Sequence, residues 1–195
     1  MRRVAALLLA GGQSTRMGRN KAFLDYQGTP LWRLQMDKLL RLQPDQLFFS
    51  VQPAMELPPG PWTFVYDRLP HLGPLGGLEA ALRLTGEGFL ITLAVDMPAM
   101  TSDFLSLLLR KAGPRGIVPH LDGFYHGASA VYPASILPLF EQILASNDRS
   151  FQHLVREALK MGLMEVEEIQ SEDASLFRNW NSPRDLKWSY SASAR

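Results

Sequence analysis

The stretch VAALLLAGGQSTRMGRNK, residues 4–21, carries the clearest fold signal in this chain. Its first seven residues, 4–10, are all apolar, which is typical of a strand buried on both faces in a parallel sheet. The rest contains three glycines and three cations, Arg16, Arg19 and Lys21. Glycines let backbone N–H groups approach a ligand closely, and such groups together with cations bind phosphate oxygens. The stretch therefore predicts a strand that ends in a phosphate-binding loop.

Two other interpretations of this stretch are weaker. The loop is neither a P-loop nor the G-x-G-x-x-G fingerprint, and a plain turn with solvated cations does not explain so many glycines and cations together. The N-terminal Met-Arg-Arg and the apolar run also resemble a signal peptide. The run is short for such a segment, and the positive charge that follows it opposes export. We therefore expect a buried strand and a cytoplasmic protein.

The composition narrows the function classes. The 195 residues suit one domain, and the formal net charge of +1 argues against a dedicated nucleic-acid binder. The chain has no cysteine, which excludes disulfides and thiolate metal sites. The apolar runs are too short to span a membrane. We expect one domain over residues 1–188, a frayed tail over 189–195, and neither nucleic acid nor membrane as a partner.

Hydrophobic periodicity predicts alternating strands and helices. Strands are expected at 3–9, 46–51, 63–66 and 89–95, and less clearly at 116–121, 128–132 and 163–169; helices are expected at 31–42, 75–84, 101–112, 135–145, 150–161 and from 182 onward. This alternation predicts a single Rossmann-like three-layer α/β/α domain with a mostly parallel central sheet. The glycine loop, Asp67 and Asp96 each follow a strand, so all three should converge on one crevice.

Two helices carry more detailed expectations. We expect Pro30 at the first helical position of 31–42. We expect Thr101 to cap the helix over 101–112. The apolar stripe expected on the first helix consists of Leu31, Leu34, Leu39 and Leu42.

The segment LAGGQSTRMGRNKAFLDYQGTPL, residues 9–31, resembles the signature of the molybdenum cofactor guanylyltransferases (the molybdopterin-guanine dinucleotide biosynthesis protein A family) of the nucleotidyltransferase superfamily. Three further segments resemble motifs of that family: GPLGGL at 73–78, VDMP at 95–98 and NWNSPRDL at 179–186. The four motifs stand in the family's order and cover nearly the whole chain. Asn20 departs from the pattern, because the family usually has Asp before the lysine.

The resemblance implies an activity and its partners. The implied enzyme transfers GMP from GTP to the terminal phosphate of molybdopterin (the molybdenum cofactor), which gives the guanine dinucleotide cofactor and pyrophosphate. The implied metal is Mg²⁺, with Mn²⁺ as a substitute. Molybdoenzyme chaperones or apoenzymes would receive the product.

The resemblance also implies roles for matching residues. The implied nucleotide-binding residues are Leu9, Ala10 and Gly11 at the base and sugar, Gly12, Arg16 and Lys21 at the triphosphate, and Ser50, Asp67, Gly73 and Asp96 elsewhere on the nucleotide. Ser50 stands where some relatives have an asparagine. Arg16, Lys21 and Asp96 form the implied catalytic set, and Asp96 is the implied metal ligand. Asn179, Trp180 and Asn181 are implied at the second substrate.

These residue types suit the implied chemistry. Attack on an α-phosphate builds negative charge on the oxygen that bridges to pyrophosphate, and cations such as Arg16 and Lys21 neutralise it. Mg²⁺ usually needs only one or two protein carboxylates beside substrate phosphates, so a single Asp96 can suffice. A phosphate acceptor is already an anionic nucleophile and needs no strong general base.

Other functions remain open at this point. The same superfamily includes cytidylyltransferases and sugar-1-phosphate nucleotidyltransferases, and a protein of this fold could bind a nucleotide without turnover. Arg149 and Arg156 are either further contacts for the acceptor's phosphate or solvated helix cations.

Overall fold

The computed structural model describes residues 3–10, 21–53, 55–68 and 72–180. The helix expected from residue 182 and the tail over 189–195 lie outside these residues, so both stay predictions. None of the helices in the described part of the chain has the length and hydropathy of a membrane-spanning segment.

The predicted N-terminal strand is the centre of the sheet. β1 (Val4–Leu9) lies between β4 (Gln46–Ser50) and β6 (Phe89–Ala94) and runs parallel to both. Its side chains alternate between two core clusters, with Ala6 and Leu8 in one and Ala5, Leu7 and Leu9 in the other. An uninterrupted apolar run is required here because both faces of the strand are buried.

Among the described residues, the main sheet has eight strands, and it is mostly parallel, as predicted. Its order is β10-β7-β9-β6-β1-β4-β5, and β8 pairs with β7. The remaining strands are β5 (Thr63–Val65), β7 (Gly116–Leu121), β8 (Phe124–Tyr125), β9 (Val131–Pro133) and β10 (Met164–Glu168). β9 is antiparallel to β6 and β7, so β6 and β7 run in the same direction. The carboxyl ends of β1, β4, β5, β6, β7 and β10 therefore share one edge.

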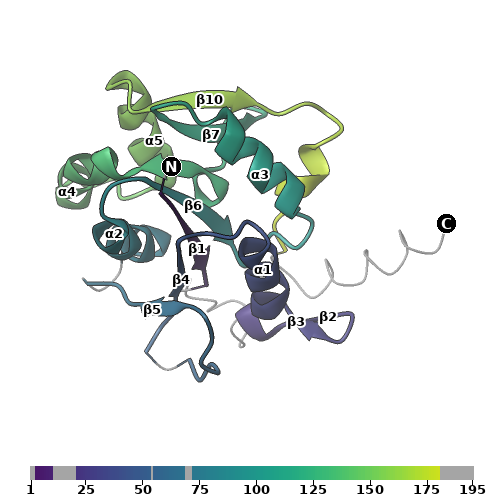
Figure 1. The fold of residues 1–195 in the computed structure, drawn as a ribbon. Helices are drawn as coiled ribbons and strands as arrows, with labels where there is room; N and C mark the ends of the chain where they lie inside the picture. Colours follow the sequence, from purple (N-terminus) through teal and green to yellow (C-terminus); the bar gives the residue numbers. More distant parts are fainter. Residues whose placement is uncertain (1–2, 11–20, 54, 69–71, 181–195) are drawn as a thin grey trace.

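Helices cover both faces of the sheet, which gives the predicted three layers (Figure 1). α1 (Leu31–Leu40) and α3 (Ser102–Lys111) pack on one face, and α2 (Pro74–Thr85), α4 (Leu137–Ala145) and α5 (Phe151–Lys160) pack on the other. Short 3-10 turns join some of these elements: η1 (Lys21–Phe23), η2 (Gly127–Ser129), η3 (Ala134–Ile136) and η4 (Ala174–Phe177).

The first helix differs from its prediction in detail. α1 begins at Leu31, and Pro30 precedes it with extended backbone as the last residue of β3 (Thr29–Pro30), which pairs with β2 (Asp25–Tyr26). The buried residues of α1 are Leu31, Trp32, Gln35, Met36 and Leu39. Leu34 is only half-buried and Leu42 lies beyond the helix, because the face that meets the sheet includes the Trp, Gln and Met positions. The Thr101 cap is confirmed, since its Oγ1 accepts a hydrogen bond from the Phe104 N–H at 3.2 Å.

Candidate active site

The predicted phosphate lysine and the predicted metal carboxylate lie side by side. Lys21 follows the glycine loop at the start of η1, and Asp96 lies in the turn after β6. The Lys21 Nζ is 3.0 Å from the Asp96 Oδ2, and each side chain is 22% exposed. The two strands that deliver these groups are neighbours, with Leu9 opposite Ala94. Lys21 and Asp96, both expected to act at the triphosphate, thus lie at the point where the strand order reverses. Open α/β sheets bind ligands at this point.

Backbone hydrogen bonds fix the ends of the strands at this edge. The Val95 N–H donates to the Leu9 carbonyl at 3.0 Å, and the Ala10 N–H donates to the Ser50 carbonyl at 3.1 Å. The end of β1 is therefore held on both sides at the point where the loop begins. Leu9 and Ala10 stay predicted contacts for the base and sugar.

Two glycines of α2 allow Ser50 and Asp67 to lie close to that helix. A Cβ atom on Gly77 would lie 2.0 Å from the Ser50 Oγ, and one on Gly76 would lie 2.5 Å from the Asp67 Cγ. Gly77 therefore needs to lack a side chain because Ser50 is buried, whereas a side chain at Gly76 would require the exposed Asp67 to move. The helix begins after Gly73, whose φ of +58° favours glycine. This brings the predicted nucleotide residues Ser50, Asp67 and Gly73 together around the start of α2.

The environment of Asp67 raises the pKa of its carboxyl group. Its residue is exposed overall, but its carboxyl group lies against the helix, and this partial burial raises its pKa above the usual value. It follows β5, which lies two strands from β1 and three from β6. At about 4.8 Å per strand, roughly 14 Å separate β5 from β6. Asp67 and Asp96 therefore suit opposite ends of an extended ligand better than a shared contact.

Trp180, the second residue of the C-terminal motif, contacts the same site. The Trp180 N–H donates to the Asp96 carbonyl at 2.8 Å, and the Trp180 ring packs edge-on against Tyr26 with centroids 5.0 Å apart. Trp180 is only 7% exposed, whereas Asn179 is exposed. A second-substrate role for these two residues stays a prediction. Four predicted site residues lie outside the described residues: Gly11, Gly12, Arg16 and Asn181. Their roles stay predictions.

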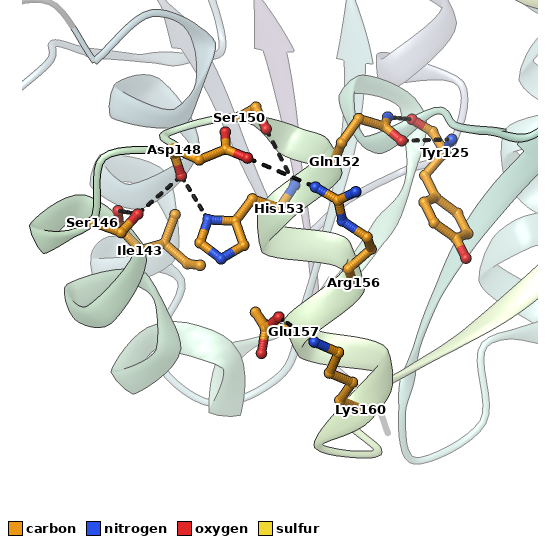
Figure 2. A network of polar contacts seen from close by, with 10 residues as sticks. All are labelled: Tyr125, Ile143, Ser146, Asp148, Ser150, Gln152, His153, Arg156, Glu157 and Lys160. Atoms are coloured by element: carbon orange, nitrogen blue, oxygen red, sulfur yellow. Dashed lines mark hydrogen bonds and ion pairs between the residues drawn. The ribbon is translucent and has the colours of Figure 1, made fainter.

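A second group of polar and aromatic side chains lies at the β7 end of this edge. The His126 ring packs on Phe177 with centroids 4.5 Å apart, and burial and the nearby His120 lower the pKa of His126. The Gln152 carboxamide binds both backbone groups of Tyr125, at 3.2 Å and 2.6 Å (Figure 2). This clamp joins α5 to β8.

Figure 2 also places one of the two candidate acceptor arginines. The Arg156 Nη2 lies 3.7 Å from the Asp148 Oδ2, and the Arg156 side chain is 56% exposed. A pair this long and this exposed contributes little to stability. The geometry agrees with a solvated helix cation.

The donor set suits Mg²⁺. No group of three His, Cys, Asp or Glu side chains that could hold a metal occurs among the described residues. The described residues therefore contain no metal site built from three or more such side chains. Mg²⁺ usually keeps waters and takes one or two carboxylates beside substrate phosphates, and the partly exposed Asp96 carboxylate meets that need.

Sequence reasoning missed the residues that hold the Asp96 turn. Gln35 and Lys38 of α1 bond to backbone carbonyls of residues 94, 97 and 98. A signal was available, because Gln35 is a polar residue four positions from both Leu31 and Leu39 on the apolar stripe.

Known proteins are similar to this chain in both sequence and fold. The MobA-like NTP transferase domain family matches residues 6–161. A molybdenum cofactor guanylyltransferase from Pseudomonas putida is 35% identical over 191 residues, which cover 93% of this chain and 94% of the relative.

Two solved structures resemble the fold. Molybdopterin-guanine dinucleotide biosynthesis protein A from Archaeoglobus fulgidus has a TM-score of 0.73 at 21% identity, with 98% of each chain covered. The 2-C-methyl-D-erythritol 4-phosphate cytidylyltransferase from Thermus thermophilus has a TM-score of 0.71 at 14% identity, with 100% of each chain covered. These likenesses show the fold alone. The domain match and the identity to the Pseudomonas putida relative along nearly the whole chain show that the chain belongs to the molybdenum cofactor guanylyltransferases of the MobA-like NTP transferase family.

Proposed function

We propose that this nucleotidyltransferase transfers GMP from GTP to the terminal phosphate of molybdopterin, the organic part of the molybdenum cofactor. The products are the guanine dinucleotide form of the cofactor and pyrophosphate. The observation that carries the proposal is the pairing of Lys21 with Asp96 at the adjacent ends of β1 and β6, 3.0 Å apart. Family membership supplies the two substrates, and the paired charges supply a place for the triphosphate.

The reaction is a displacement at the α-phosphorus. An oxygen of the acceptor phosphate forms the new bond to that phosphorus, and the bond to the oxygen of the pyrophosphate group breaks. The acceptor oxygen is already anionic, so no protein base is needed. When bound at Asp96, Mg²⁺ would supply positive charge to the phosphate oxygens.

Lys21 and Asp96 have complementary parts in this scheme. In the structure each neutralises the other, which lowers the cost of holding two partly buried charges. When nucleotide and metal bind, the Lys21 ammonium can turn to the phosphates and the Asp96 carboxylate to the metal. The Lys21 ammonium then counters the charge that develops on the leaving pyrophosphate, and Asp96 would hold the metal that supplies further positive charge.

The remaining residues would bind the nucleoside and the acceptor. Ser50, Asp67 and Gly73 lie at the β4–β5 part of the edge, away from Asp96, and Leu9 and Ala10 at the end of β1 border this part on the side that faces β6. We assign the guanosine to that part. Gly11, Gly12 and Arg16 would complete the triphosphate site, and Asn179, Trp180 and Asn181 would lie towards the acceptor.

A cytidylyltransferase activity is the second candidate, because the Thermus thermophilus cytidylyltransferase has nearly the same TM-score, 0.71, as the Archaeoglobus fulgidus protein, 0.73. Fold alone therefore does not choose the base. The sequence identity of 35% favours the guanine reaction. A protein that binds the nucleotide without turnover would bind GTP but release no pyrophosphate.

Binding and turnover together test the proposal. Calorimetry should show that GTP binds in preference to CTP, ATP and UTP, and that Mg²⁺ strengthens this binding relative to EDTA. With molybdopterin and GTP labelled at the α-phosphate, label should enter the dinucleotide as pyrophosphate is released. A preference for CTP would favour the cytidylyltransferase activity. GTP binding without turnover would contradict the proposed enzymatic activity.

Variants of the ion pair sharpen this test. Lys21→Met and Asp96→Asn should each lower kcat by about 100-fold or more, since Lys21 stabilises the transition-state charge directly and Asp96 would hold the metal that also stabilises it. Asp103→Asn is the matched control, because Asp103 is an exposed carboxylate in the first turn of α3. It should leave turnover unchanged.

A further inference from the structure

One buried amide holds both ends of the turn that carries Asp96. Gln35 is 0% exposed, and its Nε2 donates to the Ala94 carbonyl at 3.1 Å and to the Met97 carbonyl at 2.7 Å. These carbonyls lie on either side of Asp96 in the sequence. Both N–H groups of the carboxamide are therefore used on the same turn.

The turn does not need Gln35 to satisfy its carbonyls. The Met97 N–H already donates to the Ala94 carbonyl at 3.4 Å, and the Met100 N–H donates to the Met97 carbonyl at 3.1 Å. A buried polar side chain is costly unless it is fully hydrogen-bonded, and an apolar residue would fill the same space without that demand. What Gln35 adds is a connection between the turn and α1.

Lys38 completes this connection one helical turn later. Its Nζ donates to the Gln35 Oε1 at 2.7 Å and to the Pro98 carbonyl at 2.7 Å. The carboxamide of Gln35 thereby uses two donors and one acceptor, so its orientation is fixed. The lysine also ties the residue after the turn to the same helix.

The turn is held from two other directions. The Val95 N–H bonds to the Leu9 carbonyl at 3.0 Å, and the Asp96 carbonyl accepts from the Trp180 N–H at 2.8 Å. The backbone around Asp96 is thus bonded to α1, to β1 and to Trp180. The Asp96 carboxylate extends from this fixed backbone towards Lys21.

We propose that Gln35, assisted by Lys38, is a positioning residue that sets the Asp96 carboxylate for the divalent metal. This inference rests on the proposed function, because that function places Mg²⁺ at Asp96. Residues that orient a metal ligand change metal affinity or activity by about 10- to 100-fold when they are replaced. Gln35 acts only through Asp96, so its loss should weaken metal binding and leave metal-free nucleotide binding intact.

The test measures metal binding directly, with Mn²⁺ as the probe. Mn²⁺ is titrated by electron paramagnetic resonance into the full chain with GTP and without acceptor. Gln35→Met should raise the Mn²⁺ Kd by about 10-fold or more and raise the Mg²⁺ concentration for half-maximal turnover in parallel. Its affinity for GTP in EDTA should stay within about twofold of the wild type.

Thr92→Val is the matched control. Thr92 is 0% exposed and lies in β6, and its Oγ1 bonds to the Ala130 backbone, accepting at 3.1 Å and donating at 3.2 Å. This variant also removes buried hydrogen bonds, but it removes them from β6, the strand before the Asp96 turn, and none from the turn itself. It should lower the melting temperature and bind Mn²⁺ as the wild type does.

The outcomes separate the inference from the function beneath it. If Asp96→Asn binds Mn²⁺ as tightly as the wild type, the metal role of Asp96 and this inference are both overturned. If Asp96→Asn loses Mn²⁺ binding while Gln35→Met retains it, only the inference is overturned. If Gln35→Met does not fold, Lys38→Met replaces it, since that variant removes the bond that fixes the orientation of the Gln35 carboxamide and the bond to the Pro98 carbonyl. A several-fold rise in its Mn²⁺ Kd supports the inference, and wild-type affinity overturns it.

Discussion

Two neighbouring glycines of α2 should respond in opposite ways to replacement by alanine. At Gly77 the new Cβ would lie 2.0 Å from the Ser50 Oγ and 2.6 Å from the Ser50 Cβ, and Ser50 is only 2% exposed. At Gly76 the new Cβ would lie 2.5 Å from the Asp67 Cγ, which belongs to an exposed residue. Only the second neighbour can move into solvent.

The magnitudes follow from two opposing effects. Alanine in a helix interior is favoured over glycine by about 1 kcal/mol. Overpacking a core position costs roughly 1–3 kcal/mol, so Gly77→Ala should lose about 1 kcal/mol net. For a chain of this size that lowers the melting temperature by about 2–4 °C. Gly76→Ala should keep or slightly raise stability, because Asp67 swings away, and it should weaken GTP binding if Asp67 contacts the nucleotide as proposed.

Calorimetry and a double-mutant cycle measure this difference. Ser50→Gly removes both atoms that the new Cβ of Gly77→Ala would meet, so the double variant should recover stability relative to the sum of the single changes. A Gly77→Ala protein that melts at or above the wild-type temperature would refute the reasoning. A double variant whose losses simply add would refute it as well.

Three further changes test the electrostatics and the capping. Burial lowers the pKa of Lys38 from 10.5 to about 8, so between pH 8 and 10.5 the unfolded chain binds more protons than the folded chain. Over this range the free energy of unfolding of the wild type should rise by up to about 3 kcal/mol more than that of Lys38→Met. Urea titrations at several pH values measure this difference. Arg83→Met removes one of the two guanidinium partners of the Glu79 carboxylate, whose side chain is 3% exposed, and should lower the midpoint of chemical denaturation; an unchanged midpoint would contradict this. Thr101→Ala removes the cap that binds the Phe104 N–H and should cost about 1 kcal/mol in the same assay, whereas Thr101→Ser should retain most of it.

The layers of the fold were predictable because their signals are local. The apolar run at 4–10 and the periodic leucines of the helices each indicate burial within a few residues of sequence. The direction of β9 was not predictable, since it depends on pairing with β6 and β7. The β2–β3 hairpin was missed because its strands have two residues each. Its turn did leave a signal in Gln27-Gly28, where both φ angles are positive.

The site was predictable as a set of residues but not as an arrangement. Motif resemblance named Lys21 and Asp96, yet their contact joins residues 75 apart and required the strand order. The attachment of Trp180 to Asp96 likewise depends on where the chain returns after β10. Gln35 escaped because no motif contains it, and its role exists only once α1 packs beside the β6 turn.

The bond between Trp180 and Asp96 has a consequence for biosynthesis of the protein. Lys21 leaves the ribosome early, but 159 residues separate it from Trp180, and translation at about 5–20 residues per second needs roughly 8–32 s to add them. During that interval the central strands can assemble while the turn of Asp96 lacks its last fastening. A nascent chain should therefore form the sheet edge proposed to bind the nucleotide before it fixes the geometry of the proposed metal site. Pulse-labelled chains halted before residue 180 should bind Mn²⁺ more weakly than released chains.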